Sequence, residues 1–565
     1  MKHYWRSRAR FVEWASVEFL ILLIFRYRQL FIVAMRPPAA SCVFVLLLVF
    51  CICLFSGASL VAESAAPGQW IVVTPTAFKP ALAPLIEARR REGFNVTVLE
   101  MASGTDDAAA VLARVRNAVG HHAGTSDVLL AGAWENAGPG GVSNIIVPSL
   151  PGVVERMKGQ PTDLGFGLPG ADGAPTVAVG RFPARNAEEL AGMVQKTLRF
   201  ESDGGAGAWR NRLLLLIGDP GGGMLGDLYM TATLDSDLAC LDPVWTVRAL
   251  FDISSSRFFL TRPLAHKQAL QFLKEGDLFT VYLGHSNRGG IGFLDRRDLR
   301  TVEIPQGNGP FFTCGCFALQ AVAGDDGYGL TAMRNSNGPV AVIGATEESY
   351  SAAGQLAAEG LLTRLGKAPF PERLGDYWLA VAAGLARGPM DPSVFTLLDA
   401  ADGSGGKENL PTVRAEHLEM WMLLGDPALR LPAVQEDILI DTPPAIARNA
   451  ILTVTGALPQ RLAGASVKIT LERPLNSAPV DLEQVPDNRA EAARVLAANE
   501  ARANAYVITS ADAATDGNRF TATLKVPEAL PWTNLILKAS GTLSNETAFG
   551  VRVVSLSAAP VAQSK

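Results

Sequence analysis

Two residues that could together perform covalent catalysis each end a hydrophobic stretch of the sequence. His285 is the second-last residue of the run LFTVYLGHS, and Cys316 is the second-last residue of the run GPFFTCGCF. Hydrophobic runs bounded by glycine predict buried β-strands, and ligands of parallel α/β sheets bind beyond the carboxyl ends of such strands. The pattern therefore predicts an imidazole and a thiol on one edge of a sheet, which is the minimum arrangement for catalysis by a cysteine nucleophile.

Cys314 is the competing thiol in the same run. A cysteine attacks carbonyl groups as the thiolate, which a nearby imidazolium or helix-terminal N–H groups stabilise. Residues 314 and 316 point to the same face of a strand, and the one at the strand end is better exposed. We therefore predict Cys316 as the nucleophile and keep Cys314 as the alternative nucleophile, although a buried structural cysteine is the simplest interpretation of either thiol taken alone. No second Cys/His pair is present to complete a zinc site, so no metal site is predicted here.

The elements that must position these residues alternate between strand and helix patterns. In residues 66–205, the strand patterns WIVVTP, NVTVLE, DVLLAGA and TVAVGRFPA are separated by helical patterns. The linker SDGGAG leads to residues 206–433, which repeat this order and contain the two reactive residues. The alternation predicts an α/β protein with a mostly parallel sheet flanked by helices, in two related halves, of which 66–205 is the first subdomain and 206–433 the catalytic one.

The pattern of hydrophobic and polar residues changes at residue 434. Short alternating runs such as ASVKITLE, RFTATLKVP and AFGVRVVSL are separated by turn residues. This pattern predicts that residues 434–565 form an all-β, immunoglobulin-like sandwich. An Ala/Glu/Arg-rich stretch, residues 489–502, predicts a helical insertion within it.

Residues 1–65 are typical of a targeting region. Residues 1–40 hold seven Lys/Arg against two Glu, and Arg36 precedes the apolar run from Cys42 to Phe55, which small residues follow. Basic, apolar and small segments in that order are typical of a secretory signal peptide, with a membrane anchor as the alternative. We therefore predict an exported protein, whether secreted, periplasmic or at the cell surface, that meets a membrane only through this segment.

Composition narrows the range of partners. The 565 residues carry a formal net charge of −5, and no basic stripe is interleaved with aromatic residues, so nucleic acid is not a predicted partner. Three of the six cysteines lie in the targeting region, which leaves Cys240, Cys314 and Cys316. Three cysteines do not make a disulfide scaffold, and an odd number leaves at least one free thiol in an exported protein.

Several motifs together resemble those of the gingipain-type cysteine peptidases, which share the caspase-like fold. Along the chain they are VAVGRFPARNAEEL, YLGHS, FFTCGCF, GPVAVIGATEESY and LLGDPALRLP, and the resemblance covers roughly residues 68–432. The resemblance implies that His285 is the catalytic histidine and Cys316 the nucleophile. It also implies an oxyanion site formed by the backbone N–H groups of Ser286 and Cys316, with Ser286 standing where the family usually has glycine.

Three further roles are suggested beside this resemblance. Glu135, which follows the matching strand of the first half, is a candidate for the acid that orients the histidine; a solvated loop residue is the alternative. Asp163 resembles the acidic residue that reads a basic substrate side chain in arginine-specific relatives; a turn-capping aspartate is the alternative. Asp325 and Asp326 could hold a structural calcium ion, as in some relatives. No other cofactor is predicted.

The sequence thus predicts an exported cysteine endopeptidase that acts on protein or peptide substrates through a Cys-His dyad and a thioester intermediate. A catalytically silent binding or secretion-accessory protein of the same fold is the alternative function. A purely structural α/β protein, whose thiol and imidazole have no joint role, is the third.

Overall fold

The computed structural model describes most of the chain beyond the targeting region. The described residues are 68–101, 107–120, 124–134, 147–202, 207–220, 223–322, 324–366, 368–371, 373–402, 408–432, 438–544 and 546–557, without the side chains of 224, 225 and 401. They belong to one compact unit that spans residues 66–565. The predicted signal peptide or anchor lies outside the described residues. Within them, no helix combines the length and the hydrophobicity needed to cross a membrane.

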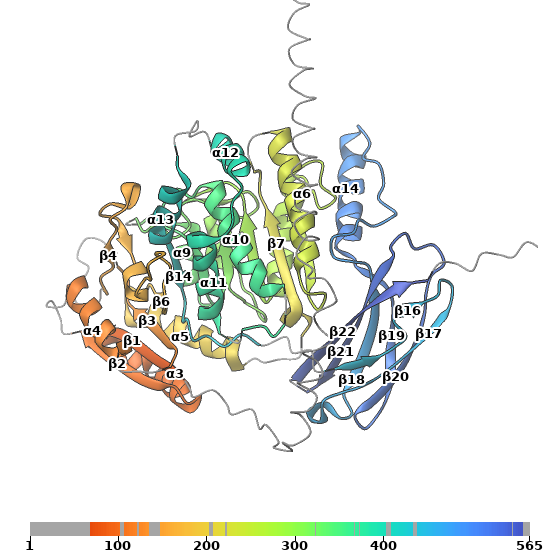
Figure 1. The fold of residues 1–565 in the computed structure, drawn as a ribbon, viewed down its shortest axis with the longest axis horizontal. Helices are drawn as coiled ribbons and strands as arrows, with labels where there is room; N and C mark the ends of the chain where they lie inside the picture. Colours follow the sequence, from red (N-terminus) through yellow and green to blue (C-terminus); the bar gives the residue numbers. More distant parts are fainter. Residues whose placement is uncertain are drawn as a thin grey trace, which may run out of the picture. The chain divides into compact units, whose positions relative to one another are not determined.

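One ten-stranded sheet carries the whole α/β region (Figure 1). Its strands, in spatial order, are β2 (Asn95–Met101), β1 (Gln69–Pro75), β3 (Ser126–Ala131), β6 (Ala178–Phe182), β14 (Trp421–Leu424), β13 (Val342–Ala345), β12 (Phe311–Thr313), β9 (Phe279–Leu283), β7 (Arg212–Ile217) and β8 (Thr246–Phe251). Neighbouring strands are parallel except at β13 and β14. The prediction of a mixed α/β fold with a mostly parallel sheet is confirmed.

The antiparallel pair β13–β14 divides this sheet into two halves that repeat one strand order. Counted along the chain, the strands β1, β2, β3 and β6 are arranged as 2-1-3-4, and β7, β8, β9 and β12 are arranged in the same way from the other end of the sheet. An approximate two-fold rotation therefore relates the two halves of the sheet. As a consequence, the carboxyl ends of the first-half strands lie at one edge of the sheet and those of the second-half strands lie at the opposite edge.

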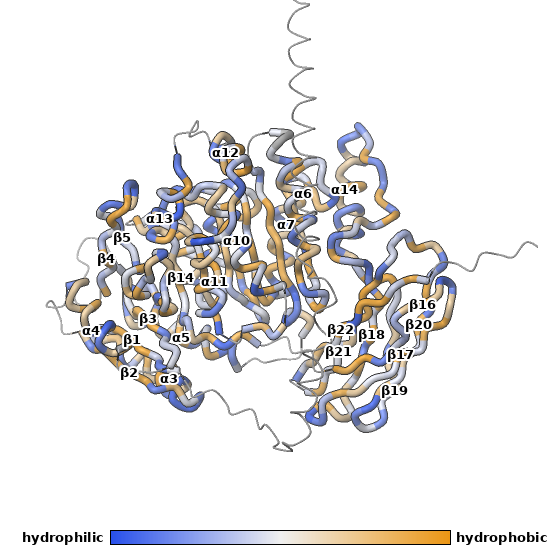
Figure 2. The backbone as a smooth tube through the Cα atoms, in the orientation of Figure 1, coloured by the Kyte–Doolittle hydropathy of each residue, from blue (hydrophilic) through white to orange (hydrophobic). Residues whose placement is uncertain are grey.

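Helices cover both faces of the sheet. They are α3 (Lys79–Arg91), α4 (Ala108–Gly120), α5 (Ala187–Ser202), α6 (Met224–Cys240), α7 (Arg262–Glu275), α8 (Arg296–Thr301), α9 (Tyr328–Arg334), α10 (Ser351–Leu365), α11 (Leu374–Arg387), α12 (Pro392–Ala401) and α13 (Leu410–Met420). Along β7, Leu213 and Leu215 enter one hydrophobic core while Leu214 and Leu216 enter the other. A strand buried on both faces is a continuous hydrophobic run, and Figure 2 shows hydrophobic residues concentrated along these strands.

The C-terminal region is a second, curled sheet. Its strands follow the order β15 (Leu439–Asp441), β17 (Ile451–Ala457), β20 (Arg519–Lys525), β19 (Val507–Asp516), β18 (Ser466–Glu472), β21 (Asn534–Leu543), β22 (Glu546–Leu556) and β16 (Ala445–Ile446). Ile438, directly before β15, donates its N–H to Phe549 O on β22 at 3.0 Å, so the sheet curls round its own core. The predicted insertion is helix α14 (Arg489–Asn504). The all-β prediction is confirmed, and the strands join in one curled, almost wholly antiparallel sheet rather than in two separate ones.

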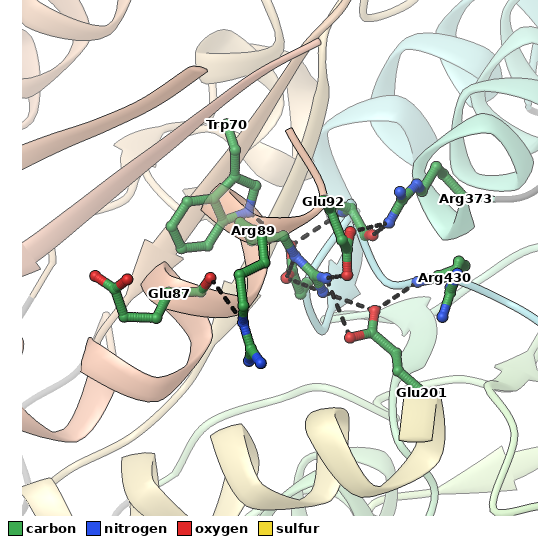
Figure 3. A network of polar contacts seen from close by, with 10 residues as sticks. Trp70, Glu87, Arg89, Glu92, Glu201, Arg373 and Arg430 are labelled. Carbon is green, nitrogen blue, oxygen red and sulfur yellow. Dashed lines mark hydrogen bonds and ion pairs between the residues drawn. The ribbon is translucent and has the colours of Figure 1, made fainter. Parts of the chain in front are cut away.

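A buried ionic network ties the first half to the turn after β14 (Figure 3). Arg89 on α3 donates Nε and Nη2 to Asp426 Oδ2 at 3.0 and 2.8 Å, and Nη2 also reaches Glu201 Oε1 at 2.8 Å. Asp426 Oδ1 accepts the indole N–H of Trp70 on β1 at 3.0 Å. The side chains of Arg89 and Asp426 are fully buried. The Gly-Asp-Pro turn of the LLGDPALRLP motif is thus a structural clamp between β1, α3 and β14.

Removal of this guanidinium should destabilise the fold strongly. An Arg89→Met variant leaves the Asp426 carboxylate buried without its cation, which typically costs about 3–5 kcal/mol. The exposed neighbour Arg90, which pairs with Glu87, supplies the control; Arg90→Met should change the free energy of unfolding by about 1 kcal/mol or less. Denaturant unfolding of both variants measures the difference, and equal losses would contradict the role of the network.

Candidate active site

His285 lies at the carboxyl end of β9, as the sequence predicts. Gly284, between the strand and the histidine, has φ +142°, and a Cβ there would come within 2.8 Å of Gly218 Cα. Only glycine permits both this conformation and this close approach. The backbone N–H of His285 donates to Asp219 O at 3.4 Å, and the side chain is exposed. The tight turn therefore leaves the imidazole exposed at the edge of the sheet.

The neighbouring strand β12 delivers the two thiols to the same edge. Cys314 follows the strand directly and donates its N–H to Tyr282 O on β9 at 2.9 Å. Cys316 is linked to the histidine loop, because Ser286 Oγ donates to Cys316 O at 2.9 Å. Gly315 makes this approach possible, since a Cβ there would lie 2.2 Å from Ser286 Oγ. The loop after β9 and the loop after β12 are thus locked together at the position of the reactive residues.

One cavity of about 280 Å³ receives all three side chains. His285, Cys314 and Cys316 line it together with residues of α6, α10 and α12. The sequence-based expectation that residues 285 and 316 share an edge of the sheet agrees with this arrangement. Ser349, the residue that accepts the Cys316 thiol at 3.5 Å through its carbonyl, also lines the cavity.

The two thiols have different surroundings. Burial raises the pKa of Cys316, and the carboxylates of Glu348 and Asp402 raise it further, whereas Arg156 lowers it. Burial alone raises the pKa of Cys314 well above its ordinary value, and its Sγ lies 3.4 Å from Gly354 O. Burial thus favours the protonated form of both thiols. Of the two, Cys316 is the one with charged groups near enough to alter its ionisation.

A hairpin from the first half supplies the positive charge beside Cys316. Its strands are β4 (Leu150–Pro151) and β5 (Pro161–Thr162). Arg156, between them, donates Nε and Nη2 to Glu416 Oε2 at 3.0 and 2.8 Å, and Nη1 to Glu348 O at 3.2 Å. Its guanidinium also stacks 4.2 Å from the centre of the Tyr350 ring. The hairpin thereby holds the loop that contains Ser349.

His417 also fixes the loop that contains Ser349. Its imidazole is completely buried, with Nδ1 bonded to Val413 O at 2.6 Å and Nε2 accepting the N–H of Tyr350 at 2.9 Å. These partners require the neutral ring with its proton on Nδ1. Burial lowers the pKa of His417 to about 3. The sequence did not point to Arg156, Ser349, Asp402 or His417 as residues of the site. Each of them acts through a partner that is distant along the chain.

Asp163 is not brought to this cavity. Its carboxylate binds Arg181 through two hydrogen bonds, Oδ1 to Nη2 and Oδ2 to Nε, each of 2.7 Å, and it also accepts Ser149 Oγ at 2.7 Å. The side chain makes no capping bond to the turn that follows it. The carboxylate is therefore part of a buried ion pair, an arrangement that neither the substrate-reading nor the turn-capping interpretation included.

The remaining predicted residues are spread over different surroundings. Glu135 lies outside the described residues, and the strand before it, β3, ends at the edge opposite to that of β9. Asp325 contacts Arg296 and Arg288, and Asp326 contacts Arg334 and Arg185. Among the described residues, no group of three or more His, Cys, Asp or Glu side chains could hold a metal ion.

An α/β sheet whose carboxyl edge presents a cysteine and a histidine to one cavity has the arrangement of a thiol-dependent hydrolase. A family model described as Peptidase family C25 matches residues 63–432, which is more than half of the chain. The chain belongs to this family of cysteine-type peptidases, and the resemblance to the gingipain family predicted from the sequence is confirmed.

Similarity to individual proteins is low. A solved structure described as "Structure of Protease" is 14% identical and aligns over 86% of this chain and 97% of its own, with a TM-score of 0.47. The sulfur carrier protein SoxY from Chlorobium limicola f thiosulfatophilum is 13% identical over 22% of this chain and 82% of its own, with a TM-score of 0.13. An engineered protein is 12% identical over 87% of this chain and 94% of its own, with a TM-score of 0.16. No curated protein matches, and likenesses this low carry no argument about function.

Loss of the charge on Arg156 should slow the reaction of Cys316 with alkylating agents. In an Arg156→Gln variant the pKa of Cys316 rises further because a neighbouring cation is lost, so alkylation near pH 8 should be roughly two- to tenfold slower. Mass-spectrometric mapping of iodoacetamide adducts at Cys316, followed against pH, measures this. Arg156→Lys should restore the profile in part, and Lys158→Gln, which removes a charge from the same hairpin, should leave it unchanged. An unshifted profile in Arg156→Gln would refute the electrostatic role.

His417 should make the protein sensitive to acid. The unfolded chain binds a proton at this residue below pH 6.5, whereas the folded protein does so only near pH 3, so stability is lost as the pH falls between these values. A His417→Gln variant lacks this component. As the pH is lowered, the free energy of unfolding of the variant should therefore fall less steeply than that of the natural chain. The two slopes should differ by about 1.4 kcal/mol per pH unit. Urea unfolding from pH 7 to pH 4 compares the two slopes, and parallel curves would contradict the assignment.

Proposed function

We propose that this chain is an exported cysteine endopeptidase that uses Cys316 as nucleophile and His285 as general base and acid. The observation that carries the proposal is the single cavity lined by both residues. Membership of a cysteine peptidase family supports the same chemistry. The basic and apolar segments before residue 65 support export.

The order of the steps follows from the need of the thiol to lose its proton when it attacks. When a substrate carbonyl binds beside Cys316, the neutral imidazole of His285 accepts the thiol proton as sulfur attacks the carbonyl carbon. The tetrahedral intermediate collapses, the imidazolium donates this proton to the leaving amine, and a thioester remains. Water, deprotonated by His285, then adds to the thioester and releases the carboxylic acid and the thiol.

The developing oxyanion requires hydrogen-bond donors close to the nucleophile. The N–H groups of Ser286 and Cys316 are the proposed donors. No residue in the described part of the chain accepts a hydrogen bond from the N–H of Cys316. The Ser286 hydroxyl is directed to Cys316 O, so the side chain that replaces the family's usual glycine links the two loops. One such donor typically contributes about 2.7–4 kcal/mol to the stabilisation of a transition state.

Two finer aspects of the fold belong to the same proposal. A caspase-like architecture is supported by the order of the parallel strands and by the family match. An immunoglobulin-like relationship of the C-terminal region is supported by its antiparallel strands around one hydrophobic core. Both suit a catalytic region followed by a β-sheet module.

Replacement of either dyad residue should abolish peptide hydrolysis. Cys316→Ala and His285→Ala should each lower kcat/KM for a fluorogenic peptide library by at least roughly 10³-fold, because the covalent route is lost. Cys314→Ala, which removes the other thiol in the cavity, should retain most of the activity. Activity that survives in Cys316→Ala and disappears in Cys314→Ala would transfer the role of nucleophile to Cys314.

Thiol labelling separates the enzyme from a silent relative of the same fold. A peptidyl chloromethyl ketone should alkylate Cys316 much faster than iodoacetamide does, and His285→Ala should remove this advantage. Labelling of the natural chain no faster than that of Cys316→Ala, together with an absence of turnover, would favour the binding or secretion-accessory alternative.

A further inference from the structure

The cavity beside the two reactive residues has mostly apolar walls. It lies between α6, α10 and α12, and both α6 and α12 contact α10 (Figure 1). Its apolar lining includes Met230, Leu234, Leu283, Ala358 and Leu398. Ligand sites of this size are commonly lined by hydrophobic side chains, with a few polar groups that fix orientation.

The acidic groups of the cavity already have partners. Asp402 accepts the Ser351 N–H at 2.8 Å on Oδ2 and the Ser351 hydroxyl at 2.6 Å on Oδ1. Glu359 accepts the side-chain amide of Gln355 at 2.9 Å, and Gln355 in turn accepts the hydroxyl of Tyr229 at 2.6 Å. Asp237 also has a polar partner. A cationic side chain that entered would lose its hydration to the mostly apolar walls.

We propose that this cavity receives a large, uncharged apolar side chain, namely that of the substrate residue whose carbonyl Cys316 attacks. This inference rests on the proposed peptidase function and adds its substrate class. Because Cys316 and His285 form part of the wall, the side chain within reach belongs to the residue beside the cleaved bond. The volume of about 280 Å³ accommodates leucine, methionine or phenylalanine. Recognition of a basic residue by Asp163 is not part of this proposal.

Substrate profiling tests the proposal on the full chain. In a peptide library varied at the residue before the cleaved bond, leucine, methionine and phenylalanine should exceed arginine and lysine by at least tenfold in kcat/KM. Ala358→Leu, which fills the cavity, should lower kcat/KM for the phenylalanine peptide at least tenfold and spare the alanine peptide, since hydrophobic pockets discriminate roughly 10–200-fold per methylene.

A charge placed in the wall gives the complementary test. Thr233 lines the cavity from α6, and Thr233→Asp should raise cleavage after arginine or lysine relative to leucine. Leu228, on the same helix, is 51% exposed and does not line the cavity. Leu228→Asp is therefore the matched control and should leave the preference unchanged.

A binding experiment keeps this inference separate from the proposed activity. Peptide amides that end in leucine, phenylalanine, arginine or lysine compete for Cys316→Ala against a fluorescent peptide that ends in phenylalanine. An apolar order of affinities supports the cavity assignment whether or not the natural chain turns peptides over. Stronger binding of arginine or lysine peptides, or no binding of any peptide, would overturn it.

Discussion

The antiparallel pairing of β13 with β14 is the constraint on which the site depends. It is a four-residue ladder in which Ala345 faces Trp421 and Val342 faces Leu424. Because it reverses the strand direction, the carboxyl end of β13 and the amino end of β14 meet at one edge, and helix α13, which leads into β14, ends there too. Glu416 and Glu419 on α13 then accept N–H groups of the first-half hairpin at Arg156, Val153 and Val154. Residues from both halves thereby surround a thiol that belongs to the second half.

The surroundings of that thiol balance two opposed effects. Burial provides a dry cavity in which electrostatic interactions are strong, but it also disfavours the thiolate. The hydrogen bond from the thiol to Ser349 O and the guanidinium of Arg156, which binds the buried Glu416, act in the opposite direction and lower the pKa of Cys316. His417 fixes the loop that contains Ser349 by accepting the N–H of Tyr350. Its lowered pKa keeps the imidazole a neutral acceptor throughout the physiological pH range. Thiol chemistry at this edge therefore depends on groups that need never contact a substrate.

Local sequence patterns were sufficient to predict most of the elements and the position of His285 and Cys316 after neighbouring strands, while their catalytic roles stay a proposal. Strands such as β7 and β9 are hydrophobic runs bounded by glycine, α3 and α4 have helical periodicity, and a reactive residue at a strand end needs no knowledge of distant partners. The reversal at β14 was not predictable in this way, because Trp421–Leu424 is a short run whose direction is set only by its pairing with β13. Asp163 shows the same limit. Its neighbours in sequence suggest a turn or a substrate contact, whereas Arg181, which it binds, lies on β6, 18 residues further along the chain.

The repeated strand order places corresponding strand ends at the two opposite edges of the sheet. Strands β3 and β6 correspond to β9 and β12, so Arg181 near the end of β6 occupies a position comparable to that of the residues around Cys314. Its guanidinium binds Gly132 O after β3 and Val147 O at 2.8 and 2.7 Å, in addition to Asp163. Gly132, with φ +159°, matches Gly284, with φ +142°, in place and in backbone conformation. A buried ion pair therefore lies near the first-half strand ends, whereas the second-half strand ends border the cavity of His285 and Cys316. In the described residues, the two edges thus carry different groups, an Arg181–Asp163 ion pair at one and a thiol and an imidazole at the other.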